Sequence, residues 1–517
     1  MNLRAVGRLL GVVILLMACF LLIPACVAIG FKNYGTAIDF LISATITGVL
    51  AGALAYLCRR KSPAVVGAPD YFRREGLAVV GLSWLVGGLS GALPYLVHGT
   101  FGPFSLASCV DSYFEAVSGL TTTGSTVMSA AQIDGMDPAI AFWRSFSHWL
   151  GGFGIVMVFV VLFPTGGRSL FRSEVPGVAR EAGHSRVRDS ALTLMRIYVG
   201  FTVLELIMLL AAGMNGFDAL LHTLGTIPTG GFSNHSSSIA HFDSVSIEVI
   251  ITLFMFLCGF NFGLYETLIR VGPRPFLRRL WGSSEARWYA GIALFASLFV
   301  ASVLWFDGGT NGGPPPGQEA GWKDYSNFWT CLRDSSFLTV SMQTSTGYGS
   351  ANYDLWPQIA RVMMMFLAVS GACAGSTGGG IKMVRILVIA KAAINGVRRF
   401  SRPRAIHAVR IDGQTLDDGV VASITGYFAL WVLVFMGGTL FLSCFSIGGK
   451  PVDLVTAGTA VLATLNNIGP GLAKVGPFMN FAELPALAKL VLTGFMILGR
   501  LEFYAMVALF VPSFWRR

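Results

Sequence analysis

The chain carries little charge for its length. Only 12% of its 517 residues are charged, 54% are hydrophobic, and the mean hydropathy is +0.66. Soluble globular proteins carry about twice that share of charge. Apolar runs long enough to cross a bilayer recur throughout, which predicts a polytopic helical membrane protein rather than a soluble one.

Signals for export and for metal binding are also missing. The first apolar run, residues 6–27, is too long for a signal peptide, and residues 24–26 lack the small-x-small cleavage pattern. The eight cysteines are scattered, and no Cys/His spacing is typical of a metal site. We therefore expect neither a cleaved leader nor a cofactor held by this chain.

The net charge of +10 does not point to nucleic acid, because the basic residues alternate with poorly charged loops. This is the positive-inside pattern of membrane proteins, and it predicts that the basic loops are cytoplasmic. The basic clusters fall in residues 59–74, 168–188, 270–287 and 382–410. Two of these loops, 166–189 and 398–414, are orientation signals or docking sites for a partner.

One short glycine motif occurs four times. Its central glycines are separated by 106, 117 and 122 residues, and each follows a moderately apolar stretch that begins at an aspartate. A repeat of this period in a membrane chain implies four copies of one unit around an axis. The central glycines are Gly124, Gly230, Gly347 and Gly469, and the aspartates are Asp111, Asp218, Asp334 and Asp453.

Each unit is expected to contain a helix, a short half-helix, a glycine loop and a second helix. The half-helices are too short to span, so the loops that follow them must be buried in protein or line water. The predicted spans are 6–31, 36–58, 76–97, 138–163, 191–212, 244–269, 286–305, 356–394, 420–445 and 484–512, and the half-helices are 108–120, 217–225, 326–342 and 451–463.

The predicted fold is therefore an all-α polytopic membrane protein with ten spans and a pseudo-four-fold pore. Two N-terminal helices (1–65) precede four pore repeats, which cover 66–170, 171–280, 281–400 and 401–517. The even number of spans places both termini on one side, which the basic loops make cytoplasmic.

Four glycine loops that meet at one axis supply a ring of backbone carbonyls, which replaces the water around a potassium-sized ion. The half-helices direct their partly negative C-terminal ends at the same centre, which favours a cation. Because the four loops differ in sequence, we expect modest discrimination between potassium and sodium. The predicted filter residues are Thr122, Thr123, Gly124, Thr229, Gly230, Ser345, Thr346, Gly347, Asn467, Ile468 and Gly469, with potassium bound at Thr122, Thr123, Thr229, Thr346, Asn467 and Ile468.

The second helix of the third unit is interrupted by five glycines within residues 371–380. A stable helix does not tolerate that many glycines, so we expect a flexible loop across the pore that acts as a gate; a packing kink is the alternative. The stretch is not a phosphate-binding loop, because Ile381 stands where that motif requires lysine. The gating residues are predicted to be Gly375, Gly378, Gly379, Gly380 and Arg500.

Arg500 lies deep in the last span, where a charge is costly and by default functional. We expect it below the filter as a barrier to cations, or in an ion pair with Glu502, Glu205 or Glu266. Arg144 and His148, four residues apart, are interpreted as anchors at the membrane interface. Residues 88–91 have the form of an intramembrane serine-protease motif, but helix packing is the favoured interpretation.

These motifs together resemble the Trk/Ktr/HKT superfamily of potassium transporters, and specifically the membrane subunit of the bacterial Trk system. The resemblance covers nearly the whole chain, and the two extra N-terminal helices are similar to the Trk branch. It rests on residues 122–125, 228–233, 344–349, 374–382, 466–471 and 499–502.

The resemblance implies a potassium uptake protein of the bacterial inner membrane, not an enzyme, with one filter glycine in each of four repeats. It implies an intramembrane gating loop in the third repeat with Arg500 beside it, a homodimer, and a cytosolic ring of nucleotide-binding regulatory subunits of the Trk A type that senses ATP, ADP or NAD(H). Potassium:proton or potassium:sodium symport is the alternative, although carriers favour inverted repeats and membrane carboxylates.

Overall fold

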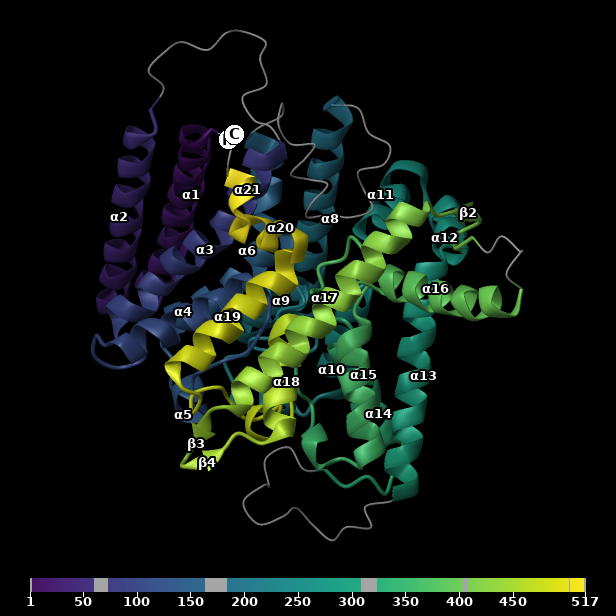
Figure 1. Cartoon of the computed structure of the whole chain (residues 1–517). Helices are drawn as coiled ribbons and strands as arrows, with labels where there is room; N and C mark the ends of the chain where they lie inside the picture. Colours follow the sequence, from purple (N-terminus) through teal and green to yellow (C-terminus); the bar gives the residue numbers. More distant parts are fainter. Residues whose placement is uncertain are drawn as a thin grey trace.

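The computed structural model describes residues 2–59, 73–162, 184–307, 323–402, 408–501 and 503–515, and these ranges are helical apart from two short β-hairpins. The first two helices, α1 (Leu3–Gly30) and α2 (Tyr34–Leu57), pack against each other and against α3 (Arg73–His98). Both ends of the chain lie at the same end of the helix bundle, at the top of Figure 1. We call this end the terminal face.

Four units follow, and each has the predicted order of helix, half-helix, loop and helix. The first unit contains α3, α4 (Leu106–Leu120), α5 (Ala130–Asp134) and α6 (Pro138–Leu162). The second contains α8 (His184–Ala211), α9 (Gly216–Thr226), η1 (Ser238–Phe242), α10 (Val245–Cys258) and α11 (Phe262–Val271), and α12 (Pro273–Gly282) leads out of it.

The third unit contains α13 (Ser284–Asp307), α14 (Phe328–Gln343), η2 (Tyr353–Leu355), α15 (Gln358–Ser370) and α16 (Met383–Ser401). The hairpin of β1 (Arg410–Ile411) and β2 (Gln414–Thr415) leads to the fourth unit, in which Arg410 pairs with Thr415. The fourth unit contains α17 (Asp418–Ser443), β3 (Ser446–Ile447), β4 (Lys450–Pro451), α18 (Leu454–Leu465), η3 (Ala473–Val475), α19 (Ala486–Leu501), α20 (Phe503–Phe510) and α21 (Pro512–Trp515).

The helical fold class is confirmed, and every predicted span corresponds to a helix or to a pair of helices. Within the described residues, six helices are long and apolar enough to cross a membrane unaided, and a seventh span is the pair α10 and α11. The expectation of one straight helix over 244–269 is wrong, because this pair bends by 90°. Asn261 causes the restart, since its side chain accepts a hydrogen bond from Gly263 N at 2.8 Å and caps α11.

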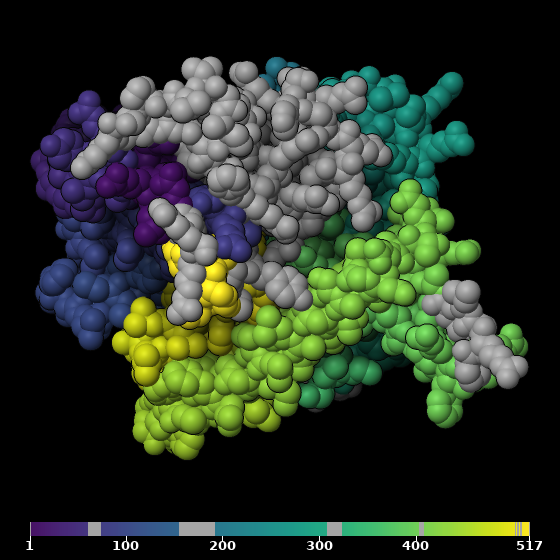
Figure 2. Space-filling view, turned by 45° about the horizontal axis from the view of Figure 1, so that its top comes forward, coloured from purple at the N-terminus to yellow at the C-terminus, as the bar shows by residue number. Residues whose placement is uncertain are grey.

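The outer surface of the bundle is apolar. Leu50 on α2, Leu294 on α13 and Leu433 on α17 are each more than half exposed. Many large apolar side chains are exposed in this way on helices long enough to cross a bilayer, which is typical of a surface that faces lipid. In Figure 2 the C-terminal helices, in yellow, lie between the purple and blue N-terminal helices and the green and teal segments. The chain is an integral membrane protein.

All four half-helices begin at a polar side chain that satisfies a free N–H group of the first turn. In the first unit Ser105 accepts a hydrogen bond from Ser108 N at 3.1 Å and forms a capping box. In the fourth unit Asp453 accepts one from Thr456 N at 2.9 Å. The other two caps are Asn215 on α9 and Asn327 on α14. These caps fix where each half-helix starts and therefore where its far end meets the centre of the bundle.

The aspartates that marked the four repeats have different roles in the structure. Asp453 is the helix cap, whereas Asp111 forms an ion pair of 2.6 Å with Lys489. Asp334 is fully buried and pairs with Lys323 at 2.8 Å. Asp218 lies in the first turn of α9 and accepts a hydrogen bond from Asn234. Asp453 also stands 16 residues before Gly469, whereas Asp111 and Asp334 stand 13 residues before Gly124 and Gly347, so the four aspartates share neither one position nor one partner.

The serine-protease-like motif is a packing site, as the sequence favoured. A side chain at Gly88 would overlap Val117 of α4, and Ser90 is buried. The small residues therefore allow α3 to approach the first half-helix closely.

Candidate cation-conducting site

Each half-helix ends in the same hydrogen-bonded turn. In the fourth unit, Ile468 N donates to Ala463 O at 2.9 Å while Asn467 adopts φ of 53°, the left-handed conformation that commonly terminates a helix. The same bond to the fifth residue before is made by the N–H groups of Thr123, Gly230 and Thr346. The left-handed residues of the four loops are Thr122 (54°), Thr229 (56°), Ser345 (59°) and Asn467 (53°).

A glycine with positive φ stands two residues after each of these positions. The four are Gly124 (81°), Gly231 (84°), Gly347 (80°) and Gly469 (96°), which we call the ring glycines. Gly230 is the central glycine expected from the sequence of the second unit, whereas the glycine with positive φ in the structure is the next residue, Gly231. Thr229 occupies the helix-terminating position, so the conformation that needs glycine falls on Gly231.

The four ring glycines connect the loops into a closed cycle. A Cβ atom on Gly469 would lie 2.8 Å from Thr123 O, and at each of the other three ring glycines it would overlap a main-chain oxygen of the next loop. These overlaps run from Gly124 to Gly230 O, from Gly231 to Thr346 O, and from Gly347 to Ile468 O. Each unit therefore contacts the carbonyl of its neighbour in the order one, two, three, four, one.

The carbonyl oxygens of this cycle belong to Thr123, Gly230, Thr346 and Ile468. The threonine hydroxyls are engaged with the ends of their own half-helices: Thr123 Oγ1 lies 2.7 Å from Thr121 Oγ1, and Thr346 Oγ1 lies 2.8 Å from Thr344 Oγ1. The main-chain oxygens, by contrast, are the atoms that lie against the ring glycine of the neighbouring loop.

A buried ion pair supports the ring from the first and second units. Arg144 Nε lies 2.8 Å from Glu115 Oε1, and both side chains are almost wholly buried. Arg144 also donates to Ser233 O at 3.0 Å, and Glu115 accepts from Val127 N at 3.0 Å. A charged pair with further hydrogen bonds on both sides holds the two loops at a fixed separation.

His148 completes this support. Its Nε2 accepts a hydrogen bond from Phe232 N at 3.2 Å, which makes Nδ1 the donor to Gly119 O at 2.7 Å. The interpretation of Arg144 and His148 as interface anchors is wrong, because both are buried behind the filter loops. Their spacing of four residues was the available signal, since it places both on the same face of α6.

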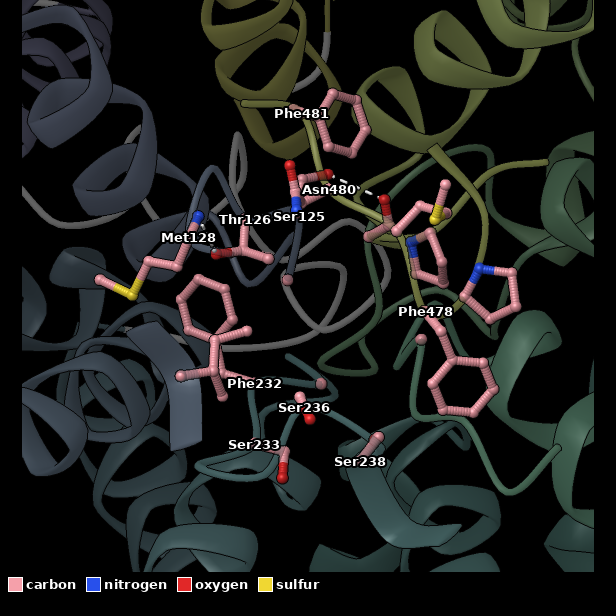
Figure 3. A pocket seen from close by; sticks show the side chains of 18 of the residues that line it. Ser125, Thr126, Met128, Phe232, Ser233, Ser236, Ser238, Phe478, Asn480 and Phe481 are labelled. Atoms are coloured by element: carbon pink, nitrogen blue, oxygen red, sulfur yellow. Dashed lines mark hydrogen bonds between the residues drawn. The ribbon is translucent and has the colours of Figure 1, made fainter. Parts of the chain in front are cut away.

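A pocket opens on one side of the ring and is lined by all four ring glycines. Figure 3 shows Ser125 and Thr126 from the first unit, Phe232, Ser233 and Ser236 from the second, and Phe478 and Phe481 from the fourth around this space. The lining therefore comes from several units and combines aromatic rings with small polar side chains. The pocket is therefore an opening next to the carbonyl cycle.

The glycine-rich interruption, residues 371–382, contacts the filter loops through the residues that precede the ring glycines. Gly379 N donates to Ser345 Oγ at 2.8 Å, and Thr377 Oγ1 donates to Ile227 O at 3.1 Å. Gly371, Gly375 and Gly380 have positive φ. We call this segment the gating loop after its predicted role; it contacts residues that precede the ring glycines, whereas the pocket is lined by the ring glycines and residues that follow them.

Close packing against the fourth filter loop explains two further glycines. A Cβ atom on Gly379 would lie 2.6 Å from Asn467 Cβ, and one on Gly380 would lie 2.8 Å from Asn466 Oδ1. Neither position tolerates a side chain without displacing the loop. The glycines of this segment therefore provide close approach as well as chain flexibility.

Arg500 joins the gating loop to the first unit. Its Nη1 donates to Thr377 O at 2.7 Å and to Thr122 Oγ1 at 3.1 Å, and its Nη2 donates to Gly151 O at 2.7 Å. Arg500 thus contacts both the first filter loop and the gating loop, and its role there stays a prediction. Of the carboxylates considered as partners, Glu266 pairs with Arg270 at 2.9 Å, and Glu502 lies outside the described residues.

The structure brings the residues predicted for the filter together with Gly378, Gly379, Gly380 and Arg500, whereas Gly375 contacts Asn261 at the start of α11. Their ability to bind and select an ion stays a prediction. Two residues of this region were not predicted from the sequence. Gly231 follows Gly230 directly, so the motif alone does not show which of the two belongs to the ring. Glu115 pairs with Arg144, which is 29 residues away.

The chain is similar to known cation transport proteins over its full length. Residues 40–517 match the TrkH family, described as a cation transport protein. The chain is 35% identical to the Trk system potassium uptake protein TrkH of Halomonas elongata and 33% identical to that of Escherichia coli K12, in each case over the full length of both chains. The crystal structure of the potassium transporter TrkH from Vibrio parahaemolyticus superimposes with a TM-score of 0.84 at 30% identity and full coverage of both chains. The chain therefore belongs to the TrkH family of cation transport proteins and is a transporter rather than an enzyme.

Proposed function

We propose that this protein takes up potassium through a channel-like pore whose selectivity filter is the cycle of carbonyls from Thr123, Gly230, Thr346 and Ile468. The closed cycle of ring glycine against neighbouring carbonyl carries the proposal. Such a ring replaces the hydration shell of a monovalent cation, and the C-terminal ends of four half-helices add negative potential at the same place.

Potassium as the substrate is supported by the relatives, which are named as potassium uptake proteins. We assign ion binding to the main-chain oxygens of the four loops. The proposed binding residues are Thr122, Thr123, Thr229, Gly230, Ser345, Thr346, Asn467 and Ile468. The ring carbonyls come from two threonines, a glycine and an isoleucine, so the four loops are unlike and discrimination against sodium is expected to be modest.

We further propose that the gating loop obstructs the pore on the side opposite the pocket and that Arg500 holds it there. The guanidinium group contacts the filter and the loop together, which supports a role as latch and electrostatic barrier. A cation in the pore would meet this fixed positive charge directly below the ring.

The remaining assignments complete the proposal. The chain divides into an N-terminal helix pair (1–65) and pore units at 66–170, 171–280, 281–400 and 401–517. It lies in the bacterial inner membrane with the terminal face in the cytoplasm, forms a homodimer, and binds a cytosolic ring of nucleotide-binding subunits that senses ATP, ADP or NAD(H). The basic loops on the side assigned to the cytoplasm support this orientation.

Uptake of rubidium into liposomes tests the function. A channel-like pore passes rubidium down its own gradient without a proton or sodium gradient. Flux that requires one of these gradients would instead establish symport. If no flux occurs under either condition, adding the cytosolic partner separates a closed pore from an inactive preparation.

A further inference from the structure

Glu285 joins the two ends of the gating loop through one carboxylate oxygen. Its Oε1 accepts hydrogen bonds from Ala374 N at 2.6 Å and from Val384 N at 3.2 Å. Ala374 lies near the start of the loop, and Val384 lies in the first turn of α16 where the loop ends. The chain from Ala374 to Val384 is therefore closed into a ring by a side chain from a different helix, α13.

The carboxylate supplies what the local sequence of α16 lacks. Lys382, the residue before this helix, makes no side-chain capping bond. The N–H groups of a first helical turn need acceptors from outside the helix, and a negative charge is favourable there. Glu285 thus acts as the cap of α16 from across the bundle, and the position of α16 depends on it.

The base of the loop is narrow at the same place. Met383 N donates to Ala372 O at 3.0 Å, and Gly371, with φ of 60°, leaves no room for a side chain against Ile381 O. The two ends of the loop are thus held side by side, and Glu285 bonds to both. Movement of the loop away from α16 requires at least one of the two bonds to the carboxylate to break.

The helix that carries Glu285 is fixed in turn by the β1–β2 hairpin. Asp412 Oδ1, in the turn of this hairpin, accepts a hydrogen bond from Ser284 N at 2.7 Å. Lys391 on α16 donates to Arg410 O of the same hairpin at 2.7 Å. The hairpin therefore bridges α13 and α16, the two helices that Glu285 connects.

We propose that Glu285 is a positioning residue of the gate, which holds the gating loop beneath the filter by binding both of its ends. This rests on the proposed role of the loop as the gate. Glu285 acts through the loop and lies outside the filter, so its loss changes how often the pore is open and leaves the preference for potassium over sodium unchanged.

The test combines flux with a direct report on the loop. Cys373 precedes Ala374, is 1% exposed, and donates its N–H to Gly259 O at 2.9 Å. In purified full-length protein with the other seven cysteines replaced by alanine, a water-soluble thiol reagent measures access to Cys373. We compare this protein with its Glu285→Ala, Glu285→Gln and Asp418→Asn variants. Asp418 is an exposed carboxylate at the start of α17 and serves as the matched control.

Glu285→Ala should raise the rate of Cys373 labelling and the basal rubidium flux by about tenfold each, because two hydrogen bonds to a charged group are lost. Glu285→Gln keeps an oxygen acceptor and should fall between Glu285→Ala and the unsubstituted protein. Asp418→Asn should leave both quantities unchanged. The ratio of potassium to sodium flux should stay constant in all variants.

Unchanged labelling and flux in folded Glu285→Ala would overturn the proposal. If Glu285→Ala does not fold, the intermediate response of Glu285→Gln decides, and its absence overturns the proposal equally. A variant with Gly378 and Gly379 deleted tests whether the loop is a gate separately from whether Glu285 positions it. Raised flux in that deletion without any response to Glu285 substitutions retains the gate and rejects Glu285. Raised labelling without raised flux in any variant rejects the loop as a gate, and the proposal with it.

Discussion

Arg500 Nη1 donates a 2.7 Å hydrogen bond to the main-chain carbonyl of Thr377, so the last membrane helix is bonded to the gating loop of the third unit. The same nitrogen lies 3.1 Å from Thr122 Oγ1 in the filter of the first unit. One positive charge therefore contacts the first filter loop and the gating loop together.

Arg500→Ala removes both the charge and the bond to the gating loop. We expect basal cation flux to rise by roughly an order of magnitude, since a unit charge near a narrow pore changes the barrier for a cation by about 1 kcal/mol or more. Rubidium uptake into liposomes measures this. Arg500→Lys retains the positive charge but lacks the several N–H donors of the guanidinium group, so it should raise the flux less than Arg500→Ala does. Unchanged flux in folded Arg500→Ala protein would contradict the barrier role.

Shortening the gating loop by Gly378 and Gly379 should raise basal flux. The deletion removes the N–H donor to Ser345 Oγ and the close approach to Asn467. Gly291→Ala, on α13 with open space around its Cα, is the control and should behave as the unsubstituted protein. Unchanged flux in the shortened protein would indicate a packing kink instead of a gate.

Gly231→Ala should reduce the ratio of potassium to sodium flux. An alanine there is strained at φ of 84°, and its side chain would overlap Thr346 O. Gly349→Ala is the matched control, because a Cβ atom at that position meets nothing closer than 3.8 Å. Equal selectivity in both variants would show that the ring does not extend through Gly231.

Glu115→Gln should destabilise the protein by about 3 kcal/mol, because it leaves Arg144 buried without its counter-charge. The double variant with Arg144→Gln should recover part of this loss, since no unpaired charge remains. Thermal unfolding in detergent across the four proteins of the cycle measures the coupling. Additive losses would mean that the two side chains do not stabilise each other.

The order of the membrane spans and half-helices was predictable, because the length of each apolar run and the spacing of the four glycine motifs are local features of the sequence. The 90° bend between α10 and α11 was hidden, since residues 245–271 read as one apolar run. Asn261 was the signal for it, because asparagine is a preferred helix cap. A single asparagine inside an apolar run is not recognised as a helix cap from sequence alone, because nothing else there indicates that one helix ends and another begins.

The features that were not predicted from the sequence depend on long-range contacts. The register of the second filter loop depends on which of two adjacent glycines adopts positive φ, and the end of α9 determines that choice. Arg144 meets Glu115 from another helix, and Glu285 lies 89 residues from Ala374. No local pattern encodes partners at such separations, so these contacts can be identified only from the packed arrangement of the helices.

Selectivity of purified protein in liposomes, measured beside Gly347→Ser, tests the central claim most directly. A side chain at Gly347 would overlap Ile468 O and break the cycle of carbonyls. The account predicts potassium-preferring flux in the unsubstituted protein and loss of that preference in Gly347→Ser, with flux retained. The same selectivity in both proteins would contradict a filter formed by the four loops.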